Sequence, residues 1–248
     1  GYRPFEPGKA YAPGDKVYWV NRKKAVIATT FGRKPIEEGV RINGAHIDSP
    51  RLDLKPVPLY EKNDIAYFKT HYYGGLRKYQ WGTIPLALHG VIIREDGAEI
   101  TVSVGEEKGE PAFCVTDLLP HLSAEQNKRP LSEGIKGEEL NILIGSMPFM
   151  DDEGDEKIKD AVKLQVMALL NEKYGITEKD FIRAEIEMVP AFCARDIGFD
   201  RSLIGAYGQD DRVCAYTALK AEIAAVSSAY TTVTVLTDKE EIGSEGNT

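Results

Sequence analysis

The feature that most constrains the fold is a change of sequence pattern that divides the chain into three parts. Short apolar runs at residues 25–30 and 40–45 predict two strands, with glycines punctuating the connection between them. From about residue 60 to residue 190 the pattern favours a β-rich region, with strand-like runs at 90–94, 99–104, 141–144 and 182–188. After about residue 196 the sequence returns to an α/β order. We therefore predict an α/β region that is interrupted by a β-rich segment.

Two helices are predicted from the spacing of apolar residues. The first covers about residues 155–174 and ends before Gly175, and we expect it to cover one face of a sheet. Its apolar positions are Ile158, Val162, Val166, Leu169 and Leu170. The second covers about residues 211–226 and is followed by a strand at 232–237. It carries Val213, Tyr216, Ala218 and Leu219.

Charge and cysteine content argue against several classes of protein. The 31 basic and 39 acidic side chains give a net charge of −8, which argues against broad affinity for nucleic acid or anionic membranes. Small molecules or peptides are therefore the expected partners. The sequence has no run of about 18 apolar residues, and its polar, proline-rich first stretch, residues 1–13, is unlike a secretion leader. Three widely spaced cysteines fit neither a disulfide framework nor a cysteine-rich zinc site, so we expect a cytoplasmic protein.

The first motif that carries chemistry is His46-Ile47-Asp48, at the exit of the strand predicted at 40–45. At a strand end, this spacing puts the imidazole and the carboxylate on the same side. One ring nitrogen can then bind a metal while the other donates its N–H to Asp48. The motif taken alone is weak, because a buried histidine satisfied by a neighbouring aspartate is the more common arrangement.

Two acidic pairs follow in the last part of the chain. Asp210-Asp211 stands at a predicted helix start, where Asp211 can cap the helix or one carboxylate can bridge two metal ions. Physical reasoning does not choose between the neighbours. Glu240-Glu241 follows the strand at 232–237, where one glutamate can bind a metal and the other can take a proton from water. Exposure of both glutamates is the simpler alternative.

Together the three motifs supply nitrogen and oxygen ligands of the kind that zinc, cobalt or manganese accept. They also resemble the motifs of a known family, the aspartyl aminopeptidase and aminopeptidase I family of zinc peptidases, and its bacterial branch most closely. The resemblance extends over essentially the whole chain. It is carried by GAHIDSPRLDLKP at residues 44–56, THYYGG at 70–75, AYGQDDRVCAY at 206–216 and DKEEIGSEG at 238–246.

The resemblance implies a role for each motif residue. It makes His46 a ligand of one metal ion and Asp48 the residue that orients it. Asp210 would bridge two Zn²⁺ ions, with Co²⁺ or Mn²⁺ as possible substitutes, and Asp211 would be a structural cap. Glu240 would be the general base and Glu241 a ligand of the other ion. The family also uses an aspartate and a histidine to which no residue of this chain is assigned.

The resemblance also implies the domain organisation. The family fold is an α/β/α zinc-exopeptidase catalytic domain with an inserted β-rich domain that mediates dimerisation. Residues 1–56 and 191–248 would form the catalytic domain, incomplete at its C-terminal part, and residues 57–190 the insertion. Relatives assemble from dimers into a dodecamer, and the inserted domain lends a histidine to a neighbouring active site. His121 is the candidate for that role, and a purely structural histidine is the alternative.

We therefore expect a metal-dependent aminopeptidase that removes the N-terminal residue of peptides, present here as part of a longer protein. Taken alone, the chain is expected to be catalytically incomplete. One alternative is a two-metal carboxypeptidase or deacylase with the same ligand set. Another is an inert fragment or assembly domain that oligomerises without chemistry.

Overall fold

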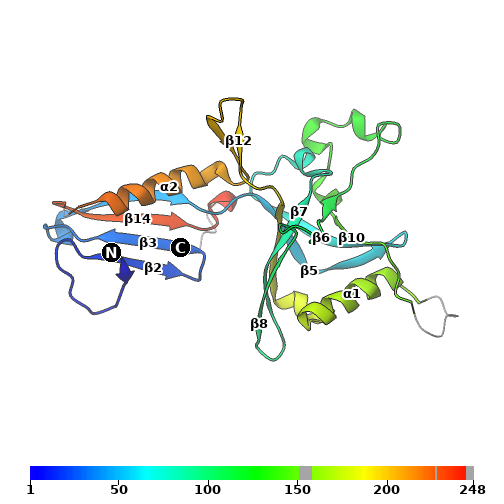
Figure 1. Cartoon of the computed structure of the whole chain (residues 1–248), viewed down its shortest axis with the longest axis horizontal. Helices are drawn as coiled ribbons and strands as arrows, with labels where there is room; N and C mark the ends of the chain where they lie inside the picture. Colours follow the sequence, from blue (N-terminus) through cyan, green and yellow to red (C-terminus); the bar gives the residue numbers. More distant parts are fainter. Residues whose placement is uncertain (151–157, 227, 244–248) are drawn as a thin grey trace. The chain divides into compact units, whose positions relative to one another are not determined.

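The computed structural model describes residues 1–150, 158–226 and 228–243, and the chain forms two compact units. Unit 1 is discontinuous and consists of Gly1–Pro50 with Gly205–Thr248. Unit 2 is the continuous segment Arg51–Ile204 between these two parts (Figure 1). The mixed α/β class predicted from the sequence is confirmed. The assignment of catalytic and inserted domains to particular ranges stays a prediction.

Unit 1 contains a five-stranded sheet in which the strand order departs from the chain order (Figure 1). Strand β14 (Thr231–Thr237) lies between β3 (Ala25–Thr30) and β4 (Val40–His46). It is antiparallel to β3 and parallel to β4, and Thr237 pairs with His46. Because parallel neighbours run in the same direction, β4 and β14 end at the same edge of the sheet. The order across the sheet is β1 (Arg3–Pro4), β2 (Lys16–Asn21), β3 (Ala25–Thr30), β14 (Thr231–Thr237) and β4 (Val40–His46).

Helix α2 (Gln209–Ala224) packs against β3, β14 and β4 of this sheet. Asp210 and Asp211 have non-helical backbone angles, so the regular helix begins at Arg212 rather than at the predicted residue 211. Only Ala215 and Glu222 of the helix are buried. Its C-terminal end also comes two residues earlier than predicted, at Ala224 rather than at 226.

Unit 2 contains a seven-stranded antiparallel sheet whose fully buried side chains include Leu52, Leu86 and Ile142. Helix α1 (Ala161–Tyr174) packs against three of its strands, as predicted for a helix covering a sheet face. The strand order is β8 (Glu99–Val104), β7 (Leu86–Ile93), β11 (Ala184–Pro190), β5 (Arg51–Lys62), β6 (Ile65–Tyr73), β10 (Ile142–Gly145) and β9 (Cys114–Val115).

Helix α1 begins later than the sequence predicted. Asp160 adopts a left-handed backbone conformation and precedes the first helical residue, Ala161, so the predicted position Ile158 lies outside the helix. The predicted range also included residues 155–157, which are outside the described residues. Val162 is buried as expected, whereas Leu169 is exposed. None of the helices formed by the described residues is both long and apolar enough to cross a membrane.

The remaining elements are short. A two-stranded sheet joins β12 (Arg195–Ile197) and β13 (Leu203–Gly205). The predicted strand at 182–188 starts at Ala184, because residues 178–183 form a 3₁₀ helix. The 3₁₀ helices are η1 (Ile36–Glu38), η2 (Lys78–Trp81), η3 (Gln126–Lys128), η4 (Leu131–Glu133), η5 (Gly137–Glu139), η6 (Glu178–Arg183) and η7 (Glu240–Ile242).

Candidate metal centre

Three chain segments meet at one edge of the unit 1 sheet and bring together side chains from all three sequence motifs. His46 is the last residue of β4, and Glu240 begins the 3₁₀ helix η7 after β14. Asp210 lies where the chain enters the regular part of α2. The His46 Nε2 atom is 3.2 Å from Asp210 Oδ1 and 3.7 Å from Glu240 Oε2. The parallel pairing of β4 with β14 is what places the histidine beside the glutamate.

The tautomer of His46 follows from its other ring nitrogen. His46 Nδ1 lies 3.0 Å from the backbone carbonyl oxygen of Asp48 and 3.3 Å from Asp48 Oδ1. A carbonyl oxygen only accepts hydrogen bonds, so Nδ1 carries the proton in the neutral ring. The lone pair of Nε2 then points at the Asp210 and Glu240 carboxylates. Such an arrangement is favourable only when a cation lies between them or when the ring itself is protonated.

The electrostatic surroundings of His46 agree with this geometry. Burial lowers the pKa of His46, but the hydrogen bond to Asp48 and the nearby carboxylates of Asp48, Glu240 and Asp211 outweigh burial and raise the pKa. The same negative field that favours a proton on the ring also favours a metal cation beside it.

Asp48 connects the two strand ends that carry the site. Its side chain is buried, and its Oδ1 and Oδ2 accept the backbone N–H groups of Glu240 and Glu241, each at 3.2 Å. The sequence predicted only that Asp48 orients His46. Its contacts with the two backbone amides were missed, because they depend on pairing between residues far apart in the chain.

The two adjacent aspartates differ in their contacts. The Asp211 carboxylate accepts hydrogen bonds from the thiol of Cys214 and from the backbone N–H groups of His46 and Cys214, and these bonds hold the pKa of Asp211 below its usual value. Since regular helix begins at Arg212, the bond from the Cys214 backbone is that of a helix cap. The Asp210 side chain is 86% exposed and approaches His46, and the peptide bond between the two aspartates is cis.

The loop before α2 holds the backbone of Asp210 through residues that the sequence did not single out. Ser49 Oγ donates to the Asp210 backbone oxygen at 3.3 Å, and Tyr207 Oη donates to the backbone oxygen of Pro50 at 2.6 Å. Gly208 has φ of +75°, and a side-chain carbon there would approach Ser49 Oγ to 3.0 Å. The glycine in this loop was the one available signal for a constrained backbone.

His46, Asp210 and Glu240 offer nitrogen and oxygen donors of the types that zinc accepts, but these atoms are not arranged as a coordination shell. Across the described ranges 1–150, 158–226 and 228–243, no group of three or more histidine, cysteine, aspartate or glutamate side chains is arranged to hold a metal ion. The Asp210 and Glu240 side chains are 86% and 62% exposed, so both carboxylates have room to turn. Glu241 contacts this group of residues through its backbone N–H, which donates to Asp48 Oδ2.

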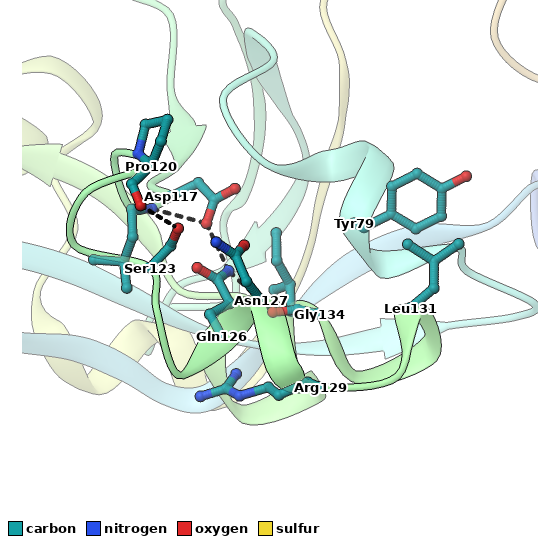
Figure 2. Close-up of a pocket in the computed structure, with 11 residues that line it drawn as sticks. Tyr79, Asp117, Pro120, Ser123, Gln126, Asn127, Arg129, Leu131 and Gly134 are labelled. Carbon is teal, nitrogen blue, oxygen red and sulfur yellow. Dashed lines mark hydrogen bonds between the residues drawn. The ribbon is translucent and has the colours of Figure 1, made fainter.

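His121 belongs to unit 2 and lies in an exposed turn. Five residues further along the chain, the Gln126 amide donates to Asp117 Oδ1 at 2.8 Å and to the Gly134 carbonyl at 3.0 Å. Figure 2 shows Asp117, Gln126 and Gly134 among the residues that line a nearby pocket. The volume of this pocket is about 390 Å³, and His121 is not one of its lining residues. Three leucines near His121 are also exposed, namely Leu118, Leu119 and Leu122.

Comparison with known proteins identifies relatives over the full chain. The family model described as aminopeptidase I zinc metalloprotease (M18) matches residues 3–248. A probable M18 family aminopeptidase 1 of Clostridium acetobutylicum is 53% identical over 252 residues, which cover 100% of this chain and 53% of that protein. The crystal structure of an M18 family aminopeptidase from Thermotoga maritima has a TM-score of 0.91 and 49% identity, covering 100% of this chain and 53% of that one.

A more distant structure shares the fold. The mApe1 dodecamer of S. cerevisiae is 20% identical with a TM-score of 0.65, and the match covers 94% of this chain and 51% of that one. The chain spans about half the length of the relatives that it matches.

Proposed function

The chain belongs to the aminopeptidase I (M18) family of zinc metalloproteases, and from that premise we propose that its His46 cluster forms part of a two-zinc centre that removes the N-terminal residue from peptides. The observation that carries the proposal is the position of His46 Nε2, which lies 3.2 Å from Asp210 Oδ1 and 3.7 Å from Glu240 Oε2. A site of this kind attracts a cation, and the donor types suit zinc.

We assign the metal-binding roles to three side chains. His46 and Glu241 would each hold a different zinc ion, and Asp210 would be the ligand shared by both. Asp48 supports this assignment through its bond with His46 Nδ1, which keeps Nε2 available. When bound, the zinc ions would supply Lewis acidity that activates water and stabilises negative charge on the substrate oxygen. Co²⁺ or Mn²⁺ are possible substitutes.

We assign the general base to Glu240. Its carboxylate is largely exposed, and its backbone N–H is fixed by Asp48, so the side chain can reach a water molecule beside His46. Glu240 takes the proton from that water as it attacks the peptide carbonyl, and then delivers the proton to the leaving amine. The proton therefore moves from water to product through a single carboxylate.

The experiment that tests the roles compares two adjacent variants in the complete gene product. Glu240→Gln should keep bound zinc and reduce kcat by about 10²–10⁴-fold, because the general base is lost. Glu241→Gln should lose zinc, because an amide oxygen is a weaker ligand than a carboxylate. Metal analysis and peptide turnover are measured on both variants. Full turnover by Glu240→Gln would refute the assignment.

Substrate assays separate this proposal from its rivals. Amino-acid p-nitroanilides should be cleaved, whereas N-acyl amino acids would be the substrates of a carboxypeptidase or deacylase with the same ligands. Zinc analysis of the 248-residue chain tests the alternative of an inert or purely assembling domain. Zinc removal should abolish hydrolysis, and zinc addition should restore it.

We further propose that the protein forms a homo-oligomer, a dodecamer built from dimers, in which unit 2 makes dimer contacts and His121 acts in a neighbouring subunit. Light scattering measures the mass of the assembly. Mixing an inactive Glu240→Gln protein with an inactive His121→Ala protein should restore activity in hybrid oligomers if His121 acts in trans. The cytoplasmic location stays a prediction from the sequence.

A further inference from the structure

The least expected group in unit 1 is the side chain of Glu222, near the C-terminal end of α2. It is completely buried, although glutamate is among the residues least often found inside proteins. No function assigned above uses it. A buried carboxylate persists only when its oxygens are satisfied by hydrogen bonds or paired charges.

Four hydroxyl groups surround the Glu222 carboxylate. Its Oε1 accepts from Thr30 Oγ1 at 2.7 Å, and its Oε2 accepts from Thr234 Oγ1 at 3.3 Å. Thr232 Oγ1 and Tyr2 Oη also lie within hydrogen-bonding distance of Oε1, at 3.1 and 3.2 Å. These donors come from β3, from β14 and from the N-terminal segment. One helical side chain is therefore bonded to two adjacent strands of the sheet.

The apolar contacts of α2 do not fix its position to the same extent. Ala215 is the only buried apolar residue of the helix, and its single methyl group offers little resistance to sliding. Lys16 Nζ adds a second polar contact by donating to the backbone oxygen of Ile223 at 2.8 Å. Directional hydrogen bonds near Glu222, rather than interlocking apolar side chains, thus define where the helix lies along the strands.

Helix position matters because the other end of α2 carries the candidate metal ligand. A helix rises about 1.5 Å per residue, so a slip of one residue would displace its N-terminal end by more than the roughly 0.2 Å that metal–ligand distances tolerate. The regular helix begins at Arg212, and the Asp211 carboxylate accepts hydrogen bonds from Cys214 in its first turn. A displacement at Glu222 would therefore be transmitted to Asp210.

We propose that Glu222 is a positioning residue, which fixes the register of α2 on the sheet and thereby places Asp210 beside His46 and Glu240. This inference rests on the proposed function of Asp210 as a metal ligand. It goes beyond that function by assigning a role to a residue at the opposite end of the helix from the site.

The test uses Co²⁺ alone as the probe, since its visible spectrum reports ligand number and geometry without requiring turnover. The complete gene product is titrated with Co²⁺ in the wild-type form and as four variants. Glu222→Gln removes the carboxylate at nearly constant volume. Thr234→Val and Thr234→Ser form a matched pair, because the first removes the hydroxyl group and the second keeps it. Asp180→Asn replaces a buried carboxylate that caps a 3₁₀ helix of unit 2. It controls for changes in Co²⁺ binding that come only from lost stability.

The expected loss of Co²⁺ affinity differs among the four variants. Glu222→Gln should weaken Co²⁺ binding by at least about tenfold and change the visible spectrum, as supporting residues of metal sites do. Thr234→Val should weaken binding about threefold, while Thr234→Ser and Asp180→Asn should match the wild type.

Three outcomes overturn the inference and are distinguishable. If wild-type protein binds Co²⁺ and a folded Glu222→Gln variant binds it equally with the same spectrum, Glu222 is purely structural and the proposed metal site stands. If the complete wild-type protein gives no Co²⁺ spectrum, the proposed site and the inference both fail. If Glu222→Gln does not fold, the comparison of Thr234→Val with Thr234→Ser tests the inference instead. Equal Co²⁺ binding by these two variants overturns the inference.

Discussion

Replacing Asp48 tests the most connected residue of the candidate site. Its carboxylate accepts the backbone N–H groups of Glu240 and Glu241 and lies 3.3 Å from His46 Nδ1. Asp48→Ala removes both acceptors, and each hydrogen bond from a partly buried N–H to a carboxylate contributes about 1–3 kcal/mol. We therefore expect a loss of about 2–6 kcal/mol in the free energy of unfolding of unit 1.

Asp48→Asn gives a finer measurement because it keeps the size of the side chain. Its single carbonyl oxygen can serve one of the two backbone N–H groups, while its NH₂ group faces the other donor. The expected loss in unfolding free energy is about 1–3 kcal/mol, with about 10–100-fold weaker metal binding from poorer orientation of His46. Asp96→Asn, in an exposed turn of unit 2, should stay within about 0.5 kcal/mol of the wild type.

The assay is urea-induced unfolding followed by fluorescence, with Co²⁺ titration of the folded variants. The reasoning would be refuted if Asp48→Asn unfolded within 0.5 kcal/mol of the wild type, as expected for a surface change, and bound Co²⁺ with unchanged affinity. That result would show that the ends of β4 and β14 are held together by other contacts.

Further predictions concern the buried cap in unit 2 and the loop before α2. Hydrogen bonds from the backbone N–H and hydroxyl of Thr177 and from Arg183 lower the pKa of Asp180, so its stabilising effect is present above the unfolded pKa of about 3.9 and is lost as pH falls through the folded pKa. Asp180→Asn should lower Tm at pH 7, and calorimetry should show the gap to the wild type closing below about pH 4. Gly208→Ala should destabilise unit 1 by about 1–2 kcal/mol from backbone strain at φ +75°, as measured by urea unfolding. Gly208→Ala should also weaken Co²⁺ binding, because Ser49 must move. Unchanged Co²⁺ binding would show that this loop does not position the metal ligands.

The sequence predicted the local parts of the site well. His46 stands at a strand end and Glu240-Glu241 directly follows a strand, and both placements depend on nearby glycines and apolar runs. The insertion of β14 between β3 and β4 was not predictable, since strand order depends on contacts between distant segments. The two backbone bonds made by Asp48 depend on that order and were missed for the same reason.

Strand β5 was missed for a different physical reason. Pro56 and Pro58 lie within it, and proline cannot donate to a strand ladder, so the sequence argues against a strand there. The structure accommodates them at an irregularity, where the register with β6 shifts between Leu54 and Leu59. Glu222 shows a similar limit, because charged residues are expected at the surface and only tertiary packing reveals the surrounding hydroxyl groups.

The discontinuity of unit 1 has a consequence for how the protein folds. His46 and Thr237 are neighbours in the sheet, yet the whole of unit 2 separates them along the chain. Closing a connection of that length costs entropy before any strand pairing compensates for it, whereas unit 2 is continuous and can fold as its own residues emerge during synthesis. We expect hydrogen exchange during refolding to protect unit 2 before the β4–β14 pair, so that metal-binding competence appears last.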